Sequence, residues 1–355
     1  MSVKKWKVIG LMSGTSLDGI DIVNTLISLK NNCYSFKIIN SETIPYSKVW
    51  ERKLRKAYFS SSKNMLKISE EYGKYLGNEV NKFITINEIN DVDFVASHGH
   101  TIFHKPNEGI TVQIGEGKIL SEITGLKVIC DFRTQDVKLG GQGAPLVPIG
   151  DRLLFSNYKY CLNLGGFANI SFEKNNKRIA FDICPVNIVL NTYANKLGYN
   201  FDKGGTIASK GTVDVELLKK LNAISFYKSD IPKSLGYEFI EEIILPILEK
   251  SKCKIADILA TFVEHIVNQI KICVDNNKNS ALFITGGGAF NTYLINELKK
   301  QLKNKIVIPN NTIINYKEAL IFALLGVLRS ENRVNCLKSV TGAIKDHSSG
   351  KIFIN

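Results

Sequence analysis

The sequence predicts an α/β protein of two lobes, and three observations support this expectation. The chain has 355 residues, which is long enough to form two separate hydrophobic cores. Its content of 44% hydrophobic and 22% charged residues fits a globular protein rather than a disordered or fibrous one. The third observation is an order of three strands followed by a helix, which occurs near the N-terminus and again in the middle of the chain.

The first half of the chain is typical of antiparallel strands that lead into a mixed sheet. Apolar runs predict strands at residues 5–12, 20–29, 34–43 and 92–97. Apolar residues at helical spacing predict helices at residues 46–59 and 63–85. This order differs from the alternating strands and helices of a dinucleotide-binding domain.

The second half repeats the same kind of order. Strands are predicted at residues 160–164, 168–172, 178–182 and 281–285. Helices are predicted at residues 185–197, 240–249, 255–277 and 316–328. Pro185 is placed to begin the first of these helices, because proline is favoured at the first helical position. The two similar halves suggest a duplication, although no repeat is visible letter by letter.

The change from one lobe to the other is expected near residues 125–131. The first lobe then comprises residues 1–127 and a C-terminal segment at about 330–355, and the second lobe comprises residues 128–329. No linker rich in proline or serine marks this boundary.

The charge and the apolar runs indicate which partners to expect. The net charge of +13 comes from scattered lysines, which favours a solvated surface over a nucleic-acid stripe. A positive field that attracts anionic ligands is the alternative. No apolar run is expected to span a bilayer; the best candidate is residues 319–328. The N-terminus does not resemble a signal peptide. We therefore expect a cytoplasmic protein without nucleic-acid or membrane partners.

The seven cysteines indicate reduced thiols. They stand at positions 33, 130, 161, 184, 253, 273 and 336, and no two of them form a Cys-x-x-Cys pair. This spacing is typical of a cytoplasmic protein and does not predict a disulfide framework or a zinc site.

The most informative segment is the glycine-rich turn between the first two predicted strands, Gly10-Leu-Met-Ser-Gly-Thr-Ser-Leu-Asp-Gly-Ile-Asp21. Small residues allow a backbone to approach a phosphate closely and to donate its N–H groups. The turn is not a P-loop, because no Gly-Lys-Ser/Thr follows it and no helix begins after it. By itself such a hairpin is more often only a turn.

Further blocks occur in order along almost the whole chain. They are Ser97-His-Gly-His-Thr101, Gly140-Gly-Gln-Gly-Ala-Pro-Leu-Val-Pro148 with Asp151, Asn163-Leu-Gly-Gly-Phe-Ala-Asn-Ile-Ser171, Phe181-Asp-Ile-Cys-Pro-Val-Asn187, Thr285-Gly-Gly-Gly-Ala-Phe-Asn291 and Ser339-Val-Thr-Gly-Ala343. Together with the first hairpin, these blocks make the chain resemble the anhydro-N-acetylmuramic acid kinases. The Gly140 block and the hairpin are specific to that family rather than general to sugar kinases.

The resemblance and the order of elements together imply an actin/Hsp70/hexokinase-type, ribonuclease-H-like fold with a nucleotide cleft between its lobes. The resemblance implies an ATP-dependent kinase that hydrolytically opens 1,6-anhydro-N-acetylmuramic acid and phosphorylates O6. The product would be N-acetylmuramate 6-phosphate, formed in peptidoglycan recycling, with ATP and Mg²⁺ as cofactors and a homodimer as the assembly. Two alternatives stay open: an amino-sugar kinase with a different substrate, and a non-catalytic ATP-binding module.

By the same resemblance, three glycine-rich segments contact the nucleotide. They are the hairpin residues Gly14, Thr15, Ser16, Leu17, Asp18, Gly19, Ile20 and Asp21, then Asn163, Gly165 and Gly166, and finally Gly286, Gly287 and Gly288. Asp18 or Asp21 is expected to orient Mg²⁺ through water, because Mg²⁺ keeps several waters and takes few carboxylates.

The resemblance identifies Asp182 as the catalytic base, which takes a proton from the water that opens the anhydro ring. From the residues alone, an aspartate that caps the next helix is a strong alternative. The sugar is expected to contact His98, Thr101, Arg133 and Glu318. The spacing of His98, His100 and His104 also suggests a metal site, but no further ligand stands nearby.

Two of these segments depart from the family pattern. Family members usually have glutamine where this chain has His100, and they read Asp-Thr-Gly-Pro-Gly-Asn where this chain reads Asp182-Ile-Cys-Pro-Val-Asn187. His100 adds a group that can titrate in the expected pocket. Cys184 and Val186 would hinder the site if the glycines they replace need a positive φ.

Overall fold

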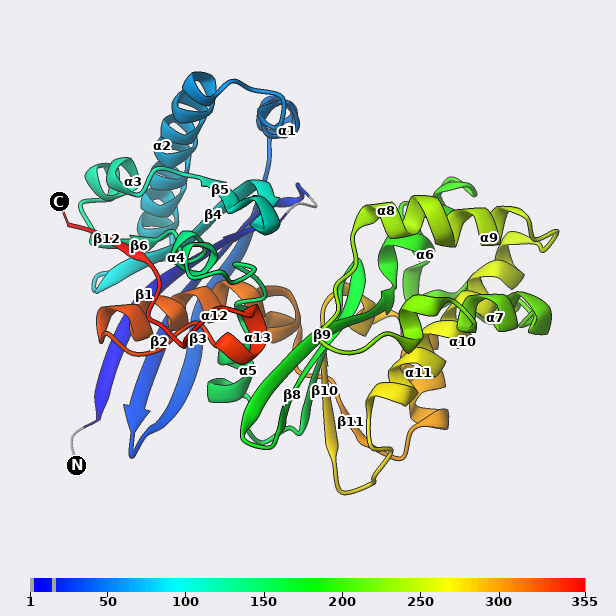
Figure 1. The fold of residues 1–355 in the computed structure, drawn as a ribbon. Coiled ribbons are helices and arrows are strands. Elements are labelled where there is room, and N and C mark those ends of the chain that lie inside the picture. The colour runs from blue at the N-terminus through cyan, green and yellow to red at the C-terminus, as the bar shows by residue number, and fades with distance from the viewer. Residues whose placement is uncertain (1–2, 15–16, 355) are drawn as a thin grey trace. The chain divides into compact units, whose positions relative to one another are not determined.

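A computed structural model of the chain describes residues 3–14 and 17–354. The chain forms two compact units, one of Met1–Leu154 with Tyr316–Asn355 and the other of Phe155–Asn315. Each unit is an α/β structure built on one sheet (Figure 1). The units are described one at a time.

The first unit is built on a mixed sheet of seven strands in the order β12-β6-β4-β1-β2-β3, with β5 paired to β4. Its strands are β1 (Lys4–Ser13), β2 (Gly19–Lys30), β3 (Cys33–Pro45), β4 (Phe94–Lys105), β5 (Ile110–Ile114), β6 (Val128–Cys130) and β12 (Lys351–Phe353). β1, β2 and β3 are antiparallel neighbours, whereas β4 lies parallel to β1 and β6 parallel to β4. The chain thus returns to this sheet at its C-terminal end.

Helices cover both faces of the first sheet. They are α1 (Lys48–Ala57), α2 (Ser62–Ile86), α3 (Gly117–Thr124), α4 (Thr134–Lys138), α5 (Val147–Leu154), α13 (Lys338–Thr341) and α12 (Asn311–Ser330), which belongs to this unit from Tyr316 onward. Ile9 and Leu11 of β1 share a buried cluster with Tyr72 and Leu76 of α2. Gly10 lies between them in sequence, and a Cβ there would come within 2.2 Å of the Ala319 carbonyl oxygen. The alternation of a strand therefore places α2 on one face and α12 on the other.

The second unit has a sheet of five strands in the order β11-β10-β7-β8-β9. Its strands are β7 (Tyr160–Leu164), β8 (Phe167–Lys174), β9 (Lys177–Pro185), β10 (Ala281–Thr285) and β11 (Lys305–Val307). Its helices are α6 (Asn187–Asn195), α7 (Val215–Asn222), α8 (Tyr237–Phe239), α9 (Leu245–Glu249), α10 (Ile255–Cys273) and α11 (Thr292–Gln301). The long helix α10 is buried along most of its length and supplies much of the core.

Five strands of the first sheet, β6-β4-β1-β2-β3, share the topology of the second sheet, β11-β10-β7-β8-β9. In each unit three antiparallel strands are followed by two strands that lie parallel to the first of the three. This is the ribonuclease-H-like arrangement, so the predicted fold class is confirmed. The nucleotide cleft between the lobes stays a prediction.

The boundaries of the units differ from those expected. Residues 128–154 and 316–329 were assigned to the second lobe, but they lie in the first unit. The reason is strand pairing and helix packing: β6 is hydrogen-bonded between β4 and β12, and α12 packs against β1. The sequence around residue 128 predicts a buried strand, but it does not indicate which sheet accepts that strand.

Helix α12 is longer than the sequence predicts. It has 20 residues and, among the described residues, is the one helix long and apolar enough to cross a membrane. Of its most apolar stretch, 67% is buried inside the protein. The core helix of a globular protein passes the same test of length and composition.

Candidate active site

The glycine-rich turn between β1 and β2 forms the first part of the candidate site. Thr15 and Ser16 lie outside the described residues. On either side of them, the Leu17 N–H donates to the Gly14 carbonyl at 3.3 Å, and Leu17 has a φ of 62°. Gly19 is buried against β3, where a Cβ would come within 2.3 Å of the Ile44 carbonyl oxygen. Glycine is therefore required at position 19 by a close approach of two strands.

Two carboxylates stand at the start of β2. Asp18 is exposed, and Asp21 is half-buried with its Oδ1 accepting a hydrogen bond of 2.6 Å from the Thr43 hydroxyl. Burial raises the pKa of Asp21; the bond from Thr43 opposes that shift, and the charge of Asp18 adds to it. The charge of Asp18 is therefore close enough to influence Asp21.

His98 and Arg133, both expected at the sugar, are in direct contact. Arg133 Nε and Nη2 lie 3.1 and 3.0 Å from His98 Nε2, and Arg133 Nη1 donates to the Gly143 carbonyl at 2.6 Å. His98 Nδ1 lies 3.0 Å from the Gly99 carbonyl, which only accepts, so the proton is on Nδ1 and Nε2 is the acceptor. Burial lowers the pKa of His98 well below its ordinary value. A neutral imidazole therefore helps to orient the guanidinium.

Glu318 of α12 directly follows Lys317, which forms a buried ion pair with Asp151 of α5. Lys317 Nζ lies 2.8 Å from Asp151 Oδ1, and each side chain is 5% exposed. Burial raises the pKa of Glu318, while the nearby charges of Lys317 and Arg133 lower it and that of Asp21 raises it. The first unit thus brings Glu318 and Arg133, expected at the sugar, within electrostatic reach of Asp21 from the phosphate hairpin. The Lys317–Asp151 pair was not anticipated, because its partners lie far apart in sequence.

His100 belongs to a buried chain of hydrogen bonds that the sequence did not reveal. Its Nδ1 lies 2.7 Å from Ser13 Oγ, which lies 2.6 Å from the Tyr46 hydroxyl, which in turn lies 2.5 Å from the Tyr72 hydroxyl. Burial lowers the pKa of His100 to about 4. The imidazole is therefore neutral at neutral pH, and Ser13, the last residue of β1, connects it to Tyr46.

The substitution His100→Gln should make the protein less sensitive to acid. The pKa of His100 falls from 6.5 to about 4 on folding, so between these values the unfolded chain takes up a proton that the folded chain does not. Stability should therefore fall as the pH falls, by about 2 kcal/mol between pH 7 and pH 5 from this group alone. Urea unfolding of both proteins at both pH values tests this. An equal loss of stability in the two proteins would contradict it.

The three histidines of this strand do not converge. His104 is exposed and lies 3.2 Å from the Thr111 hydroxyl, whereas His98 contacts Arg133 and His100 contacts Ser13. The alternative of a metal site at these histidines therefore finds no support in the described residues. Thr101, the fourth residue expected at the sugar, lies on β4 and accepts from Gln113 Nε2 of β5 at 3.3 Å.

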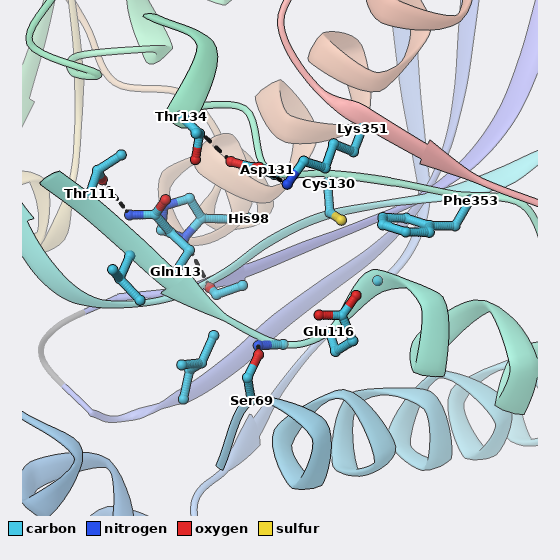
Figure 2. A pocket seen from close by; sticks show the side chains of 15 residues that line it. Ser69, His98, Thr111, Gln113, Glu116, Cys130, Asp131, Thr134, Lys351 and Phe353 are labelled. Atoms are coloured by element: carbon cyan, nitrogen blue, oxygen red, sulfur yellow. Dashed lines mark hydrogen bonds and ion pairs between the residues drawn. The ribbon is translucent and has the colours of Figure 1, made fainter. Parts of the chain in front are cut away.

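A cavity of about 190 Å³ lies beside β4, β5, β6 and β12, with His98 in its wall (Figure 2). Asp131 borders it in a left-handed conformation, with a φ of 56°, and is paired with Lys351 Nζ at 2.9 Å. Pockets for small molecules are usually about 300 Å³ or larger, so this cavity is too small for a nucleotide or a whole amino sugar. We therefore do not assign the substrate to it.

In the second unit, two of the glycine-rich segments lie side by side. Asn163 of β7 pairs with Thr285 of β10, so the turns that follow these strands are neighbours. Gly286 has a φ of 82°, and a Cβ there would come within 2.6 Å of Asn163 Oδ1. Gly288 lies against Leu164, where a Cβ would be 2.7 Å from the leucine Cβ. The structure thus unites Asn163 with the Gly286 segment, as expected for one nucleotide site.

The turn between β7 and β8 also meets the start of α6. The Val186 and Asn187 N–H groups donate to the carbonyls of Gly166 and Gly165 at 2.7 and 3.2 Å. A Cβ on Gly166 would meet no atom closer than 3.9 Å, so its surface is open. Gly287 is similarly open, with its nearest atom at 3.6 Å. These open glycines allow a ligand to approach the backbone.

Asp182 lies within β9 and not at its end. β9 continues to Pro185, and α6 begins only at Asn187 with Val186 as its N-cap. The predicted helix start at Pro185 was therefore wrong, and Asp182 does not cap this helix. The reason is strand pairing: Phe167 of β8 still pairs with Pro185. The register shifts between Ala168 and Asn169, so a bulge forms at Ile183, the kind of feature that re-aims neighbouring side chains.

The environment of the Asp182 carboxylate suits a base. Its Oδ2 accepts a hydrogen bond of 2.9 Å from the Leu235 N–H, and its own N–H donates to the Lys233 carbonyl at 2.9 Å. Burial raises the pKa of Asp182 above its ordinary value, and the bond from Leu235 partly offsets this. A raised pKa makes a carboxylate a stronger base, provided that it stays ionised at the working pH. The partner segment at residues 233–235 was not anticipated.

Cys184 and Val186 do not adopt the left-handed conformation that favours glycine. Neither is among the residues with a positive φ. Both side chains are fully buried in the hydrophobic core of the second unit, together with Val189 and Phe262. The positive φ that would require glycine is therefore absent at both positions, and Val186 has a φ of −132° and a ψ of −100°.

The substitution Cys184→Gly should destabilise the protein. It removes a fully buried side chain and adds backbone freedom to the unfolded state, for a cost of about 2 kcal/mol in the free energy of unfolding. Cys184→Ala is the matched control and should cost about half as much, because it keeps the Cβ. Chemical denaturation measures both changes. A Cys184→Gly protein as stable as the original would show that the side chain crowds its surroundings.

Comparison with known proteins covers nearly the whole chain. A family model described as anhydro-N-acetylmuramic acid kinase matches residues 6–355. Relatives with that name include one from Gamma-proteobacterium EBAC31A08, 35% identical over 352 residues that cover 95% of each chain. Another, from Shewanella sediminis, is 33% identical and covers 97% of this chain and 98% of its own. A third, from Haemophilus influenzae, is 32% identical, with 99% of both chains covered.

Proposed function

Because this chain belongs to the anhydro-N-acetylmuramic acid kinase family, we propose that it is an ATP-dependent kinase with 1,6-anhydro-N-acetylmuramic acid as its substrate. The enzyme adds water across the anhydro bridge and transfers the γ-phosphoryl group of ATP to O6. The products are N-acetylmuramate 6-phosphate and ADP. This chemistry would serve peptidoglycan recycling in the cytoplasm, and the assembly would be a homodimer.

Asp182 is the general base in this proposal. It accepts a proton from a water molecule as the water oxygen attacks the anomeric carbon. The bond between that carbon and O6 then breaks, and O6 attacks the γ-phosphorus as the bond to the ADP oxygen breaks. The proton leaves Asp182 for solvent at the end of the cycle. The hydrogen bond from the Leu235 N–H supports this role, because it holds one carboxylate oxygen in a fixed direction.

The glycine-rich segments are the proposed nucleotide contacts. The open surface of Gly166 and Gly287 and the left-handed Gly286 suit a ligand that must come close to the backbone. Asn163, Gly165 and Gly288 complete this set in the second unit. In the first unit the hairpin from Gly14 to Asp21 would contact the phosphates, with Thr15 and Ser16 as its hydroxyl donors.

Asp18 and Asp21 would hold Mg²⁺ through water molecules, and the ion would neutralise charge on the transferred phosphate. The fit rests on two carboxylates at the start of β2, of which Asp18 is exposed and Asp21 is half-buried. The Thr43 hydroxyl fixes Asp21 through its Oδ1.

Four residues of the first unit are the proposed sugar contacts. Arg133 stays positively charged at neutral pH, because burial lowers its pKa only to about 10. Its guanidinium is held by His98 and by the Gly143 carbonyl, which suits a fixed contact with the lactyl carboxylate. The Glu318 carboxylate would accept hydrogen bonds from sugar hydroxyls, and the Thr101 hydroxyl would donate one to a sugar hydroxyl.

The observation that carries the proposal is the family match over residues 6–355, with Asp182 in the environment of a base. A panel of sugars with ATP tests it, with ADP release as the readout. The anhydro sugar should give the highest kcat/KM, well above that of ordinary N-acetylmuramate. Equal turnover of N-acetylmuramate would reject the ring-opening assignment. ADP release at the same rate with and without each sugar would reject the proposed sugar kinase activity.

A further inference from the structure

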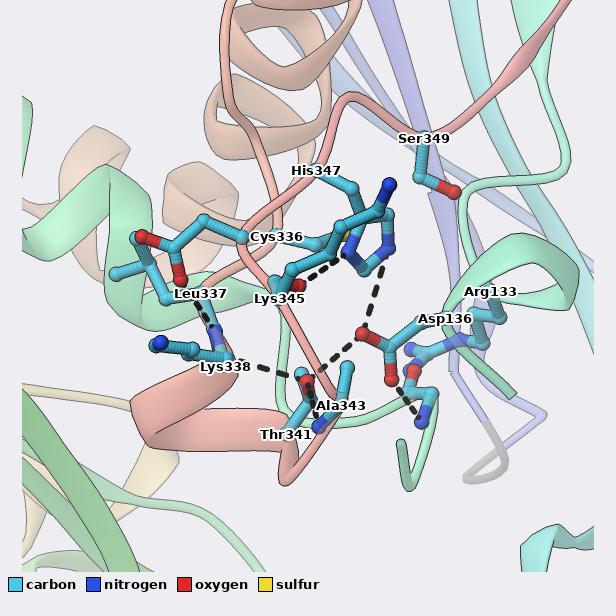
Figure 3. Close-up of polar contacts among 12 residues, drawn as sticks. Arg133, Asp136, Cys336, Leu337, Lys338, Thr341, Ala343, Lys345, His347 and Ser349 are labelled. Carbon is cyan, nitrogen blue, oxygen red and sulfur yellow. Dashed lines mark hydrogen bonds and ion pairs between the residues drawn. The ribbon is translucent and has the colours of Figure 1, made fainter. Parts of the chain in front are cut away.

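Three buried side chains outside the proposed active site offer metal-binding atoms to one another (Figure 3). They are Asp136, Cys336 and His347, which are 0%, 2% and 6% exposed. Their candidate ligand atoms all lie within 4.8 Å of one another. Cys336 and His347 form a two-residue antiparallel bridge, so their backbones are joined across the C-terminal segment, and Asp136 belongs to α4.

One ring nitrogen of His347 has no hydrogen-bond partner among the described residues. Its Nδ1 lies 3.1 Å from the Lys345 carbonyl, which can only accept, so Nδ1 carries a proton. Its Nε2 is buried without a hydrogen bond and lies 3.4 Å from Asp136 Oδ1. This is the usual arrangement of a metal-binding histidine, which donates its other N–H to a backbone carbonyl. A cation between Nε2 and the carboxylate would satisfy both groups.

Asp136 is held in place by its other contacts. Its Oδ1 accepts from the Thr341 hydroxyl and its Oδ2 from the Gly143 N–H, each at 2.7 Å. The distance from its Oδ1 to His347 Nε2 is 3.4 Å. It can be compared with the edge of a tetrahedral zinc site, which is the distance between two ligand atoms. With bonds of about 2.0–2.1 Å, that edge is about 3.3 Å. Two of the ligand atoms are therefore already at zinc spacing.

Cys336 supplies the sulfur that distinguishes this set from a magnesium or calcium site. Its Sγ lies 3.9 Å from the Phe132 carbonyl oxygen and also contacts the Ser349 side chain, which offers a further oxygen. Zinc displaces the proton of a coordinating thiol, so binding would release it.

We propose that Asp136, Cys336 and His347 bind one zinc ion, with Ser349 or a water molecule as the fourth ligand. The ionised aspartate and thiolate balance the charge of the ion, so the site stays neutral beside Arg133. The ion fastens the C-terminal segment to α4 and, through Asp136, to Gly143, whose carbonyl holds Arg133. The site is structural and separate from the proposed reaction.

The zinc content of the full chain tests this proposal. Protein free of any histidine tag is dialysed against zinc, passed over a chelating resin and analysed by mass spectrometry of the metal. We expect about one ion per chain, reduced roughly tenfold or more in Cys336→Ser and in His347→Gln. Cys253→Ser is the matched control, because Cys253 also contacts a carboxylate, that of Asp214 at 3.3 Å. A chain without zinc, or equal content in Cys336→Ser, would overturn the proposal.

A second measurement uses the unmodified protein, so it does not depend on whether a variant folds. Cobalt replaces zinc in such sites, and a thiolate ligand then gives a strong charge-transfer band in the near ultraviolet. The unmodified chain should show this band on titration with cobalt, and zinc should remove it. Absence of the band in the unmodified, folded chain would overturn the proposal.

Discussion

Asp182→Asn should lower kcat by roughly 10²–10⁴ while the protein stays folded and still binds ATP. The asparagine amide has the same shape and keeps an oxygen that accepts from the Leu235 N–H. It cannot take a proton from water, so the step that opens the ring loses its base. Steady-state kinetics with the anhydro sugar measure the loss, and circular dichroism checks the fold.

The pH profile separates a base from a merely structural aspartate. Burial raises the pKa of Asp182 above the ordinary value of 3.8. As the pH falls, the Asp182 carboxylate is therefore protonated at a higher pH than an ordinary aspartate. The original enzyme should therefore show an acid limb in kcat/KM that Asp182→Asn lacks. Asp230→Asn, at an exposed position in a nearby loop, is the control and should behave like the original. Near-normal turnover of Asp182→Asn would remove this residue from the mechanism.

Lys317→Met should lower the free energy of unfolding by about 3–5 kcal/mol, because it leaves the Asp151 carboxylate buried without its cationic partner. Lys317 and Asp151 are each 5% exposed, and 2.8 Å separates their charged atoms. Water therefore cannot replace the lost ammonium. Chemical denaturation at neutral pH measures the change.

Two further variants test the cause of that loss. Lys317→Met with Asp151→Leu should regain much of the stability, because two apolar groups then replace the pair. Lys351→Met breaks a pair in which the lysine is 66% exposed, and it should cost no more than about 1 kcal/mol. Equal losses for Lys317→Met and Lys351→Met would show that burial does not control the strength of these pairs.

Local patterns predicted much of the fold. The three N-terminal strands, β7 and β10 appear where apolar runs indicated them. Short apolar runs bounded by turn residues are too short for most helices and therefore favour strands. β4 was predicted to end at Ser97 but continues to Lys105 and returns as β5. The residues beyond Ser97 include three histidines and give no apolar alternation, so the pairing with β5 decides their structure.

Contacts between distant residues could not be predicted from spacing. The Asp182 carboxylate is held by Leu235, and Arg133 by His98 and Gly143. The same limit applies to the proposed zinc ligands: no Cys-x-x-Cys pair marks them, and Asp136 lies 200 residues from Cys336. In the first unit, the folded sheet, with its C-terminal strand β12 beside β6, brings such distant residues together.

The most direct test of the proposed reaction is the mass of the product formed in water enriched in ¹⁸O. The anhydro sugar and ATP are incubated with the enzyme, the reaction is stopped early, and the sugar product is analysed by mass spectrometry. Ordinary N-acetylmuramate in the same water controls for exchange at the anomeric carbon. The proposal predicts a product that has gained one phosphoryl group and one water, with the heavy oxygen at the anomeric carbon. A phosphorylated sugar with its anhydro ring intact, or one that gains no heavy oxygen beyond the control, would contradict it.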